Sequence, residues 1–170
     1  MKFPKDILVI DFEGLDEPVQ VGAVLLDRET LEEKKSIRSY IWSDLKGEVK
    51  GVSGISQETL IDAPSQQEVG RTFHETFGSD VLLACWVANA DLKNLEKILG
   101  AAGIPLFPTF DYHVIDIWPA AYLYLLRRGY HGGVRSDEIF EEYGIPNRGE
   151  HDALEDARIA AAILRRISIE

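Results

Sequence analysis

Two acidic residues follow directly on an apolar run near the start of the chain. Residues 7–10 are all apolar, and Asp11 and Glu13 come next, with one residue between them. Side chains at positions i and i+2 of a strand point to the same face, so a strand here places two carboxylates side by side where it leaves the core. At about 6–7 Å the two charges repel each other, and a divalent cation between them offsets that repulsion. Hard oxygen ligands suit Mg²⁺ or Mn²⁺, although a strand end that simply turns into solvent gives the same pattern.

A second group of candidate residues lies near the other end of the chain, in the segment His151-Asp-Ala-Leu-Glu-Asp156. From the loop before the expected last helix, His151 can approach a site that Asp156 lines, because five helical residues rise only about 7.5 Å. A neutral imidazole is a suitable base for activating water. The alternative is that His151 caps the helix and Asp156 is an exposed helix acid. The alanines at 153, 157 and 160 weigh against that alternative, because they place Asp156 near the packing face.

The hydrophobic pattern predicts the elements that position these side chains. Strands are expected at 6–13, 19–27 and 35–42, and their connections are too short for crossover helices, so they form an antiparallel meander. A buried strand at 81–87 and a short strand at 113–117 follow. Helices are expected at 56–60, 65–78, 91–102, 119–128, 136–143 and 152–167. This order predicts an α/β fold in which helices flank a mixed sheet of about five strands, as one domain over residues 1–170.

Composition and charge bound the function. The 170 residues carry 18 basic and 29 acidic side chains, a net charge of −11. Such a charge argues against broad duplex binding, but bound cations can still hold a short piece of nucleic acid. The single cysteine, Cys85, excludes an internal disulfide framework and a cysteine-rich zinc site. Because no apolar run approaches about 20 residues and the first residues do not read as a signal peptide, we expect a cytoplasmic protein without a membrane partner.

These motifs, in this order, resemble those of the DEDDh 3′→5′ exonucleases of the RNase T and DNA polymerase III epsilon type. The match rests on Asp11-Phe-Glu13 followed by V-x-x-G-A-V, and on H-D-A-L-E-D-A from His151, which fits H-x-A-x-x-D-A at every fixed position. Segments 54–64, 114–116 and 143–146 resemble further stretches of such proteins. The resemblance covers essentially the whole chain. It implies a ribonuclease H-like three-layer fold and phosphodiester hydrolysis from a 3′ end.

The resemblance also implies a mechanism. Two Mg²⁺ or Mn²⁺ ions would be held by four carboxylates, those of Asp11, Glu13, Asp91 and Asp156. His151 would accept the proton of the attacking water, and the products would be nucleoside 5′-monophosphates. The partners would be single-stranded DNA or RNA 3′ ends. Relatives of this type are often dimers, so a homodimer is one compatible assembly.

Three further residues are expected to contact substrate, namely Gly14, Leu15 and Asn89. Gly14 and Leu15 follow the first acids, where the chain can approach a terminal nucleotide closely. Leu15 either wedges against the last base or is an ordinary loop leucine. Phe12 points to the strand face opposite Asp11 and Glu13, so we expect it in the core.

The second motif departs from the family pattern. The family usually shows N-A-x-F-D, whereas Asn89-Ala90 is followed here by Asp91-Leu-Lys93, and Lys93 stands at the strict aspartate position. In the favoured interpretation Asp91, at the start of the helix, takes the place of that aspartate. Asp91 could at the same time be the helix N-cap. In the alternative, the second carboxylate is lost, Lys93 lies near the metal position, and the protein is a weakened or inactive binding module with the exonuclease fold.

Overall fold

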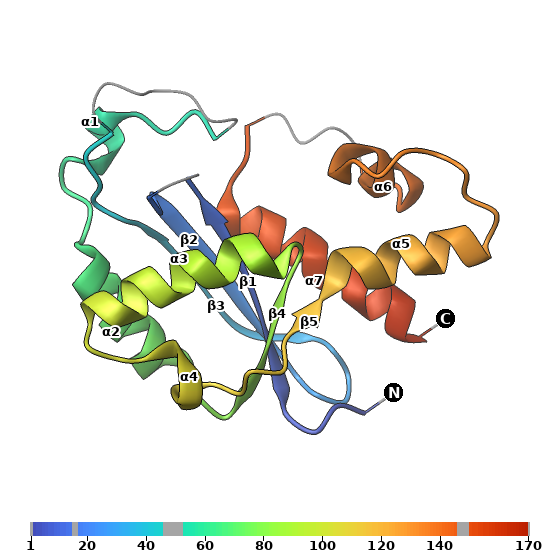
Figure 1. The fold of residues 1–170 in the computed structure, drawn as a ribbon, viewed down its shortest axis with the longest axis horizontal. Coiled ribbons are helices and arrows are strands. Elements are labelled where there is room, and N and C mark those ends of the chain that lie inside the picture. The colour runs from blue at the N-terminus through green and yellow to red at the C-terminus, as the bar shows by residue number, and fades with distance from the viewer. Residues whose placement is uncertain (1, 15–16, 46–52, 146–149, 170) are drawn as a thin grey trace.

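A five-stranded mixed sheet forms the centre of the molecule (Figure 1). The computed structural model describes residues 2–14, 17–45, 53–145 and 150–169. The strand order is β3-β2-β1-β4-β5, with β1 antiparallel to β2 and parallel to β4. The strands are β1 (Asp6–Glu13), β2 (Gln20–Leu26), β3 (Glu33–Tyr40), β4 (Val81–Cys85) and β5 (Ile115–Asp116). The predicted combination of an antiparallel meander with later parallel strands is therefore confirmed.

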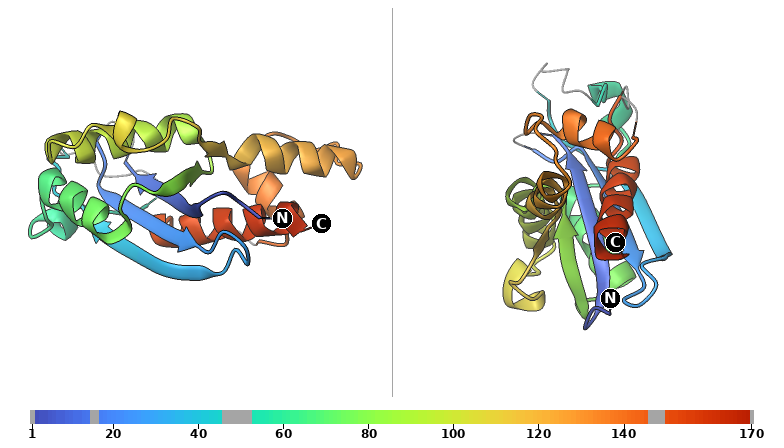
Figure 2. Two further views of the ribbon diagram at one scale, coloured as in Figure 1. Left: turned by 90° about the horizontal axis from the view of Figure 1, so that it is seen from below. Right: turned by 90° about the vertical axis from the view of Figure 1, so that its right-hand side faces the viewer.

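Helices cover both faces of this sheet, and the two further views show the resulting layers (Figure 2). On one face α7 packs against β1 and β2, with α5 and α6 beside it, and on the other face α2 packs against α3. The helices are α1 (Gln57–Leu60), α2 (Gln66–Phe77), α3 (Ala88–Ala101), α4 (Leu106–Thr109), α5 (Ile117–Arg127), α6 (Ser136–Glu142) and α7 (Ala153–Ile169).

The central strand β1 separates two hydrophobic clusters. Ile7 and Val9 belong to the cluster that α5, α6 and α7 complete, and Leu8 and Ile10 to the cluster on the side of α2 and α3. Because side chains alternate along a strand, Asp11 and Glu13 share the face of Ile7 and Val9, which is the face toward α7. Phe12 lies in the opposite cluster and is buried, as predicted for a core residue.

The start of α3 corrects one prediction. The helix begins at Ala88 rather than at Asp91, and its N-cap is Val87, which has no side-chain cap hydrogen bond. Asp91 therefore lies inside the first turn and is not the N-cap. Its carboxylate instead accepts a hydrogen bond from the backbone N–H of Phe12 on β1. A long-range contact, which local sequence rules do not include, has taken the side chain that would otherwise cap the helix.

Other boundaries moved by a few residues. The last two predicted strands are shorter than expected. The strand β3 ends at Tyr40, and the N–H of Trp42 donates to the carbonyl of Pro64. The short helix α4 was not predicted. The capping box of α2 was predicted correctly, because Ser65 and Glu68 exchange both of its hydrogen bonds.

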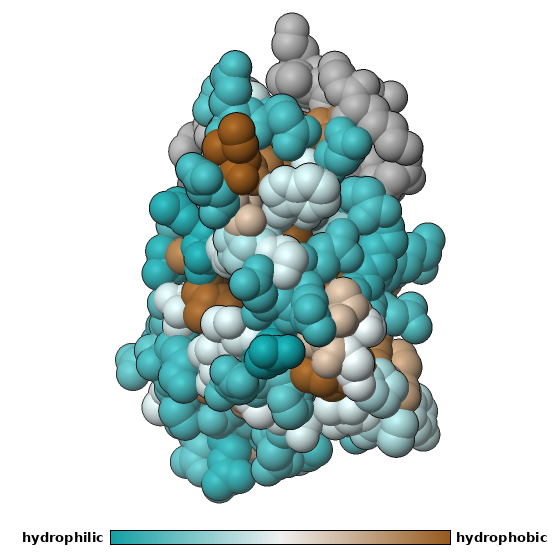
Figure 3. All heavy atoms as spheres, turned by 90° about the vertical axis from the view of Figure 1, so that its left-hand side faces the viewer, coloured by the Kyte–Doolittle hydropathy of each residue, from teal (hydrophilic) through white to brown (hydrophobic). Residues whose placement is uncertain are grey.

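One face of the molecule is mainly polar (Figure 3). On the face that carries α1 and α2, apolar side chains are scattered among hydrophilic ones (Figure 3). Within the described part of the chain, no helix has both the length and the apolar character needed to cross a membrane.

Candidate active site

The carboxyl end of β1 carries the first two candidate acids. Asp11 is partly buried, and Glu13 is only 8% exposed. The strand reaches this edge after four fully buried residues, at positions 7–10. Both carboxylates lie on the strand face toward α7.

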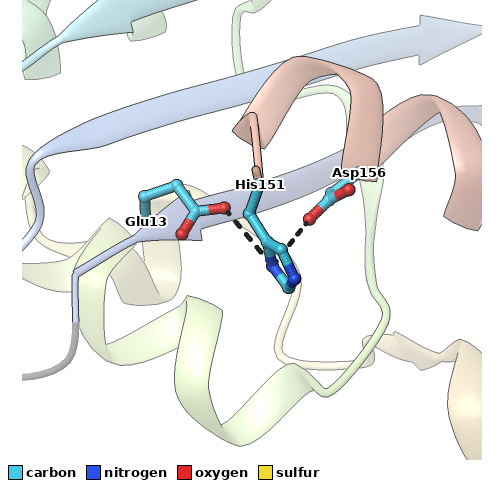
Figure 4. Close-up of side chains that lie close together, drawn as sticks. All are labelled: Glu13, His151 and Asp156. Atoms are coloured by element: carbon cyan, nitrogen blue, oxygen red, sulfur yellow. Dashed lines mark ion pairs between the residues drawn. The ribbon is translucent and has the colours of Figure 1, made fainter. Parts of the chain in front are cut away.

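The start of α7 brings the second group to the same place. The Nδ1 atom of His151 lies 3.4 Å from Oδ2 of Asp156 and 4.0 Å from Oε1 of Glu13 (Figure 4). Asp156 is in the first turn of α7 and is buried, so it is not an exposed helix acid. His151 does not cap the helix, because Oδ1 of Asp152 accepts the N–H groups of Leu154 and Glu155. Residues from opposite ends of the chain thus converge in one cluster.

Asp91 approaches the same strand end from α3. Its Oδ1 accepts the N–H of Phe12, between the two acids of β1, at 3.2 Å. The pKa of the Asp91 carboxyl is raised to about 7, mainly by burial and also by the nearby charges of Glu13 and Asp116, although the hydrogen bond from Phe12 acts in the opposite direction. Lys93, two residues later on α3, is exposed. Asp91 is therefore the residue of this motif whose carboxylate reaches β1.

The thiol of Cys85 lies close to several acidic side chains at this edge of the sheet. Burial raises the pKa of its thiol well above the ordinary value, and the charges of Asp91, Asp11 and Asp116 raise it further. Cys85 lies beside Ile10 in the parallel pairing of β4 with β1, and beside Asp116 in the pairing with β5. The three acids therefore surround the end of β4.

This donor set fits divalent cations. Among the residues that the structure describes, one ligand atom each from Glu13, His151 and Asp156 lie within 4.8 Å of one another. Hard carboxylate oxygens are the ligands that Mg²⁺ and Mn²⁺ prefer. The raised pKa of Asp91 shows that burial and its charged neighbours disfavour its ionised form in the metal-free protein. A cation in the pocket would stabilise that ionised form, which is the form that binds metal.

The three residues predicted to contact substrate have fewer described contacts with the acidic residues. Gly14 has a positive φ of 105°, and its carbonyl accepts a hydrogen bond from Nδ2 of Asn94. A Cβ at Gly14 would lie 2.1 Å from the carbonyl oxygen of Glu17, so the turn after β1 requires glycine. Leu15 lies outside the described residues. Asn89 is exposed in the first turn of α3, and none of the described contacts joins it to the acids.

Three residues near the site were missed by the sequence analysis. The side-chain amide of Asn94 donates a hydrogen bond to the carbonyl of Gly14. Asp116 accepts a hydrogen bond from the N–H of Ala88 at the start of α3. Gln20 pairs with Glu13 across β1 and β2 and binds the start of α7. The signal for Asp116 was its place at the end of a strand parallel to β4. Asn94 and Gln20 gave no such signal, because their roles depend on long-range contacts.

Two comparisons of sequence bear on the family. The model of the RNase T family, described as Exonuclease, matches residues 8–164. Among curated proteins, the chain is 27% identical to DNA polymerase III subunit epsilon of Aquifex aeolicus (strain VF5), over 94% of this chain and 79% of that protein. The resemblance found in the sequence is therefore confirmed at the level of the family.

Solved nuclease structures share the fold. The nuclease domain of 3'hExo, a DEDDh family member bound to rAMP, has a TM-score of 0.76 at 18% identity and matches 99% of this chain and 94% of its own. Cell-death related nuclease 4 (CRN-4) has a TM-score of 0.75 at 20% identity, and the match covers 96% of this chain and 64% of CRN-4. Escherichia coli exonuclease I with a dT13 oligonucleotide has a TM-score of 0.77 at 16% identity, over 97% of this chain and 41% of the enzyme. The predicted ribonuclease H-like fold is confirmed by these matches.

Proposed function

Because the chain belongs to the RNase T exonuclease family, we propose that it is a metal-dependent 3′→5′ exonuclease of the DEDDh type. It would hydrolyse single-stranded DNA or RNA ends to nucleoside 5′-monophosphates. The observation that carries the proposal is the convergence of Glu13, His151 and Asp156 with Asp91 at the end of β1. The family and the structural neighbours support nuclease activity, and the residues at this edge supply the groups that such hydrolysis requires.

Each site residue has a role in this proposal. Two divalent cations would be held by the carboxylates of Asp11, Glu13, Asp91 and Asp156. When bound, the cations supply Lewis-acid stabilisation of the negative charge that develops on the phosphodiester and on the departing oxygen. His151, beside Glu13 and Asp156, accepts the proton of the attacking water. The bond between phosphorus and the 3′ oxygen of the preceding nucleotide breaks, which releases a nucleoside 5′-monophosphate and leaves a 3′-hydroxyl on the strand.

Single-stranded ends suit this chain for two reasons. The net charge of −11 repels a long polyanion, so binding that relies on local cations favours a short stretch at the terminus. The structural neighbours include exonuclease I with a dT13 oligonucleotide and a 3′-exonuclease described in 3′-end specific recognition of the histone mRNA stem-loop. Nucleic acid ends are therefore the substrates to test first, as both DNA and RNA.

The structure weighs against the inactive binding module. That alternative required Lys93 to lie near the metal position in place of a carboxylate. Lys93 is exposed on α3, whereas the carboxylate of Asp91 is buried against β1. The contact of Asp91 with β1, beside Glu13, therefore supports the proposal that Asp91 supplies the fourth carboxylate.

The test is hydrolysis of a short oligonucleotide in Mg²⁺ or Mn²⁺. A label on the 3′-terminal nucleotide should be released at once as a mononucleotide, and a 5′ label should give a ladder of successively shorter strands. Asp11→Asn should abolish both results because it removes a charged ligand without changing the shape of the side chain. Asp62→Asn, which changes an exposed aspartate, is the matched control and should keep full activity.

Two outcomes would reject the proposal. If the 5′-labelled strand is cut internally, the protein is an endonuclease. If the wild-type protein and Asp11→Asn behave alike with both DNA and RNA, the carboxylate pocket is not a hydrolytic site.

A further inference from the structure

A buried glutamine connects the strand next to Glu13 with the start of α7. Gln20 is 2% exposed and pairs directly with Glu13 across β1 and β2. Its Oε1 accepts the backbone N–H of Ala153 at 2.8 Å, and its Nε2 donates to Oδ2 of Asp152 at 3.2 Å. One buried side chain thus satisfies a backbone group and a carboxylate of the two residues that follow His151.

Asp152 is held from three directions. Its Oδ1 caps α7 through the N–H groups of Leu154 and Glu155. Its Oδ2 accepts hydrogen bonds from Gln20 and from Nη1 of Arg38 on β3, the latter at 3.1 Å. The carboxylate therefore joins the first turn of α7 to two strands of the sheet.

The backbone of α7 also lies unusually close to β2 at this point. A Cβ at Gly22 would lie 2.1 Å from the carbonyl carbon of Ala153, which no side chain can tolerate without a shift of the backbone. Gly22 lets the helix start against the strand, and Gln20, on the same strand face, binds the helix there. Close approach and hydrogen bonding together fix residues 152 and 153 relative to β2.

His151 directly precedes these two residues in the chain. The two ion-pair contacts described for its ring, to Asp156 and Glu13, are 3.4 Å and 4.0 Å long, which is too long for strong hydrogen bonds. Its chain neighbour Asp152 is held by shorter hydrogen bonds, of 3.1–3.2 Å. We propose that Gln20 is a positioning residue, which holds Asp152 and Ala153 so that the His151 imidazole faces Glu13 and Asp156.

This inference rests on the proposed function, in which His151 accepts a proton. A displacement of about 1 Å in a reacting group can lower a rate by about 100-fold. We therefore expect Gln20→Met, which removes both hydrogen bonds but keeps the side-chain length, to lower kcat by about 10- to 100-fold with little change in KM. Gln66→Met is the matched control, since Gln66 binds Glu17 through an exposed hydrogen bond, and it should leave kcat unchanged.

A double-variant cycle tests whether Gln20 acts through His151. In the background of His151→Ala, the same Gln20→Met change should lower kcat by less than about twofold, because the group it positions is already absent. An equal loss in both backgrounds would overturn the inference and leave the proposed function intact. No effect of His151→Ala on the wild-type rate would instead reject the proposed function.

Exchanging the donor and the acceptor of the hydrogen bond between Gln20 and Asp152 should restore activity. Gln20→Glu alone places a second carboxylate against Asp152, and Asp152→Asn alone places an amide donor against the amide of Gln20, so each single variant should lose activity. The double variant restores one donor and one acceptor, and it should recover most of kcat. A double variant no better than the worse single variant would overturn the proposal.

The metal-free protein gives a readout that does not depend on activity. Hydrogen exchange of the Ala153 amide should speed up in Gln20→Met but not in Gln66→Met, because Gln20 is the acceptor of that amide. Nuclear Overhauser contacts between the His151 ring and the side chain of Glu13 should weaken in the same variant. Unchanged exchange and unchanged contacts in a folded Gln20→Met would show that Gln20 positions nothing, whether or not the protein is a nuclease.

Discussion

Replacing Asp91 with asparagine removes a buried charge from the pocket but keeps the oxygen that accepts the N–H of Phe12. Burial, with Glu13 and Asp116, raises the pKa of Asp91 from 3.8 to about 7. Between these values the native protein holds a proton that the unfolded chain has released. The wild-type protein therefore loses stability as the pH rises through this range, and the full penalty is present above pH 7.

The size of this penalty follows from the pKa difference. A change from 3.8 to about 7, at about 1.4 kcal/mol per pKa unit, gives about 4 kcal/mol as an upper value. We expect Asp91→Asn to raise the free energy of unfolding by about 2–4 kcal/mol at pH 8 in the absence of metal, and by much less at pH 4.5. Hydrolysis in Mg²⁺ should fall at least about 100-fold, because the loss of a direct ligand exceeds the usual cost of losing its outer partners.

Urea unfolding in EDTA at the two pH values measures the stability difference. Asp62→Asn serves as the control because that aspartate is exposed, and it should change stability little at either pH. Addition of Mg²⁺ should stabilise the wild-type protein far more than Asp91→Asn, since the cation binds the ionised carboxylate. If Asp91→Asn is less stable than the wild type at pH 8, or if the difference is the same at pH 4.5, the assignment of Asp91 as a penalised buried charge is wrong.

Four shorter predictions address the rest of the site. His151→Ala should lower kcat by about 10²–10⁴-fold, and a smaller loss in steady-state assays would remove its role as a base. Treatment with EDTA should abolish hydrolysis and Mn²⁺ should restore it, whereas activity that survives chelation would exclude the carboxylate site. Cys85 should react with a thiol reagent only after unfolding, because it is buried and its thiol has a raised pKa. Rapid labelling of the native protein would contradict the burial of Cys85. Gly22→Ala should lower the free energy of unfolding in urea by about 1–3 kcal/mol. The control Gly100→Ala should not lower it, because a Cβ there meets nothing within 4 Å. Equal effects of the two changes would disprove the close approach of α7 to β2.

Local patterns were enough to predict the parts of the site that a single element supplies. The apolar run before Asp11 and Glu13 indicated a buried strand that ends in two acids, and the alanines around Asp156 indicated a helix face against the sheet. Both inferences agree with the burial of residues 7–10 and of Asp156. Short-range hydrophobic periodicity is enough to predict such burial within one strand or one helix. The pattern around Ser65 and Glu68 likewise predicted a capping box, which needs residues only three positions apart.

The remaining features depend on pairing between distant segments. Asp91 lies inside the first turn of α3, and its carboxylate binds Phe12, 79 positions away. Gln20 gave no signal in the sequence, since its partners are 132 and 133 positions away. A lone polar residue in a strand is usually solvent-facing, and only the register that pairs Gln20 with Glu13 makes it a bridge to α7.

The site combines rigid placement with electrostatic strain. The fold gathers Glu13, Asp91 and Asp156 where each is nearly buried, and the raised pKa values of Asp91 and Cys85 show that negative charge is disfavoured there. Hydrophobic burial along β1 offsets that cost, because residues 7–10 are fully inaccessible to solvent. The Asp91 charge that destabilises the metal-free protein is one that a cation would neutralise. Metal affinity and metal-free stability should therefore change in opposite directions when Asp91 is replaced by asparagine.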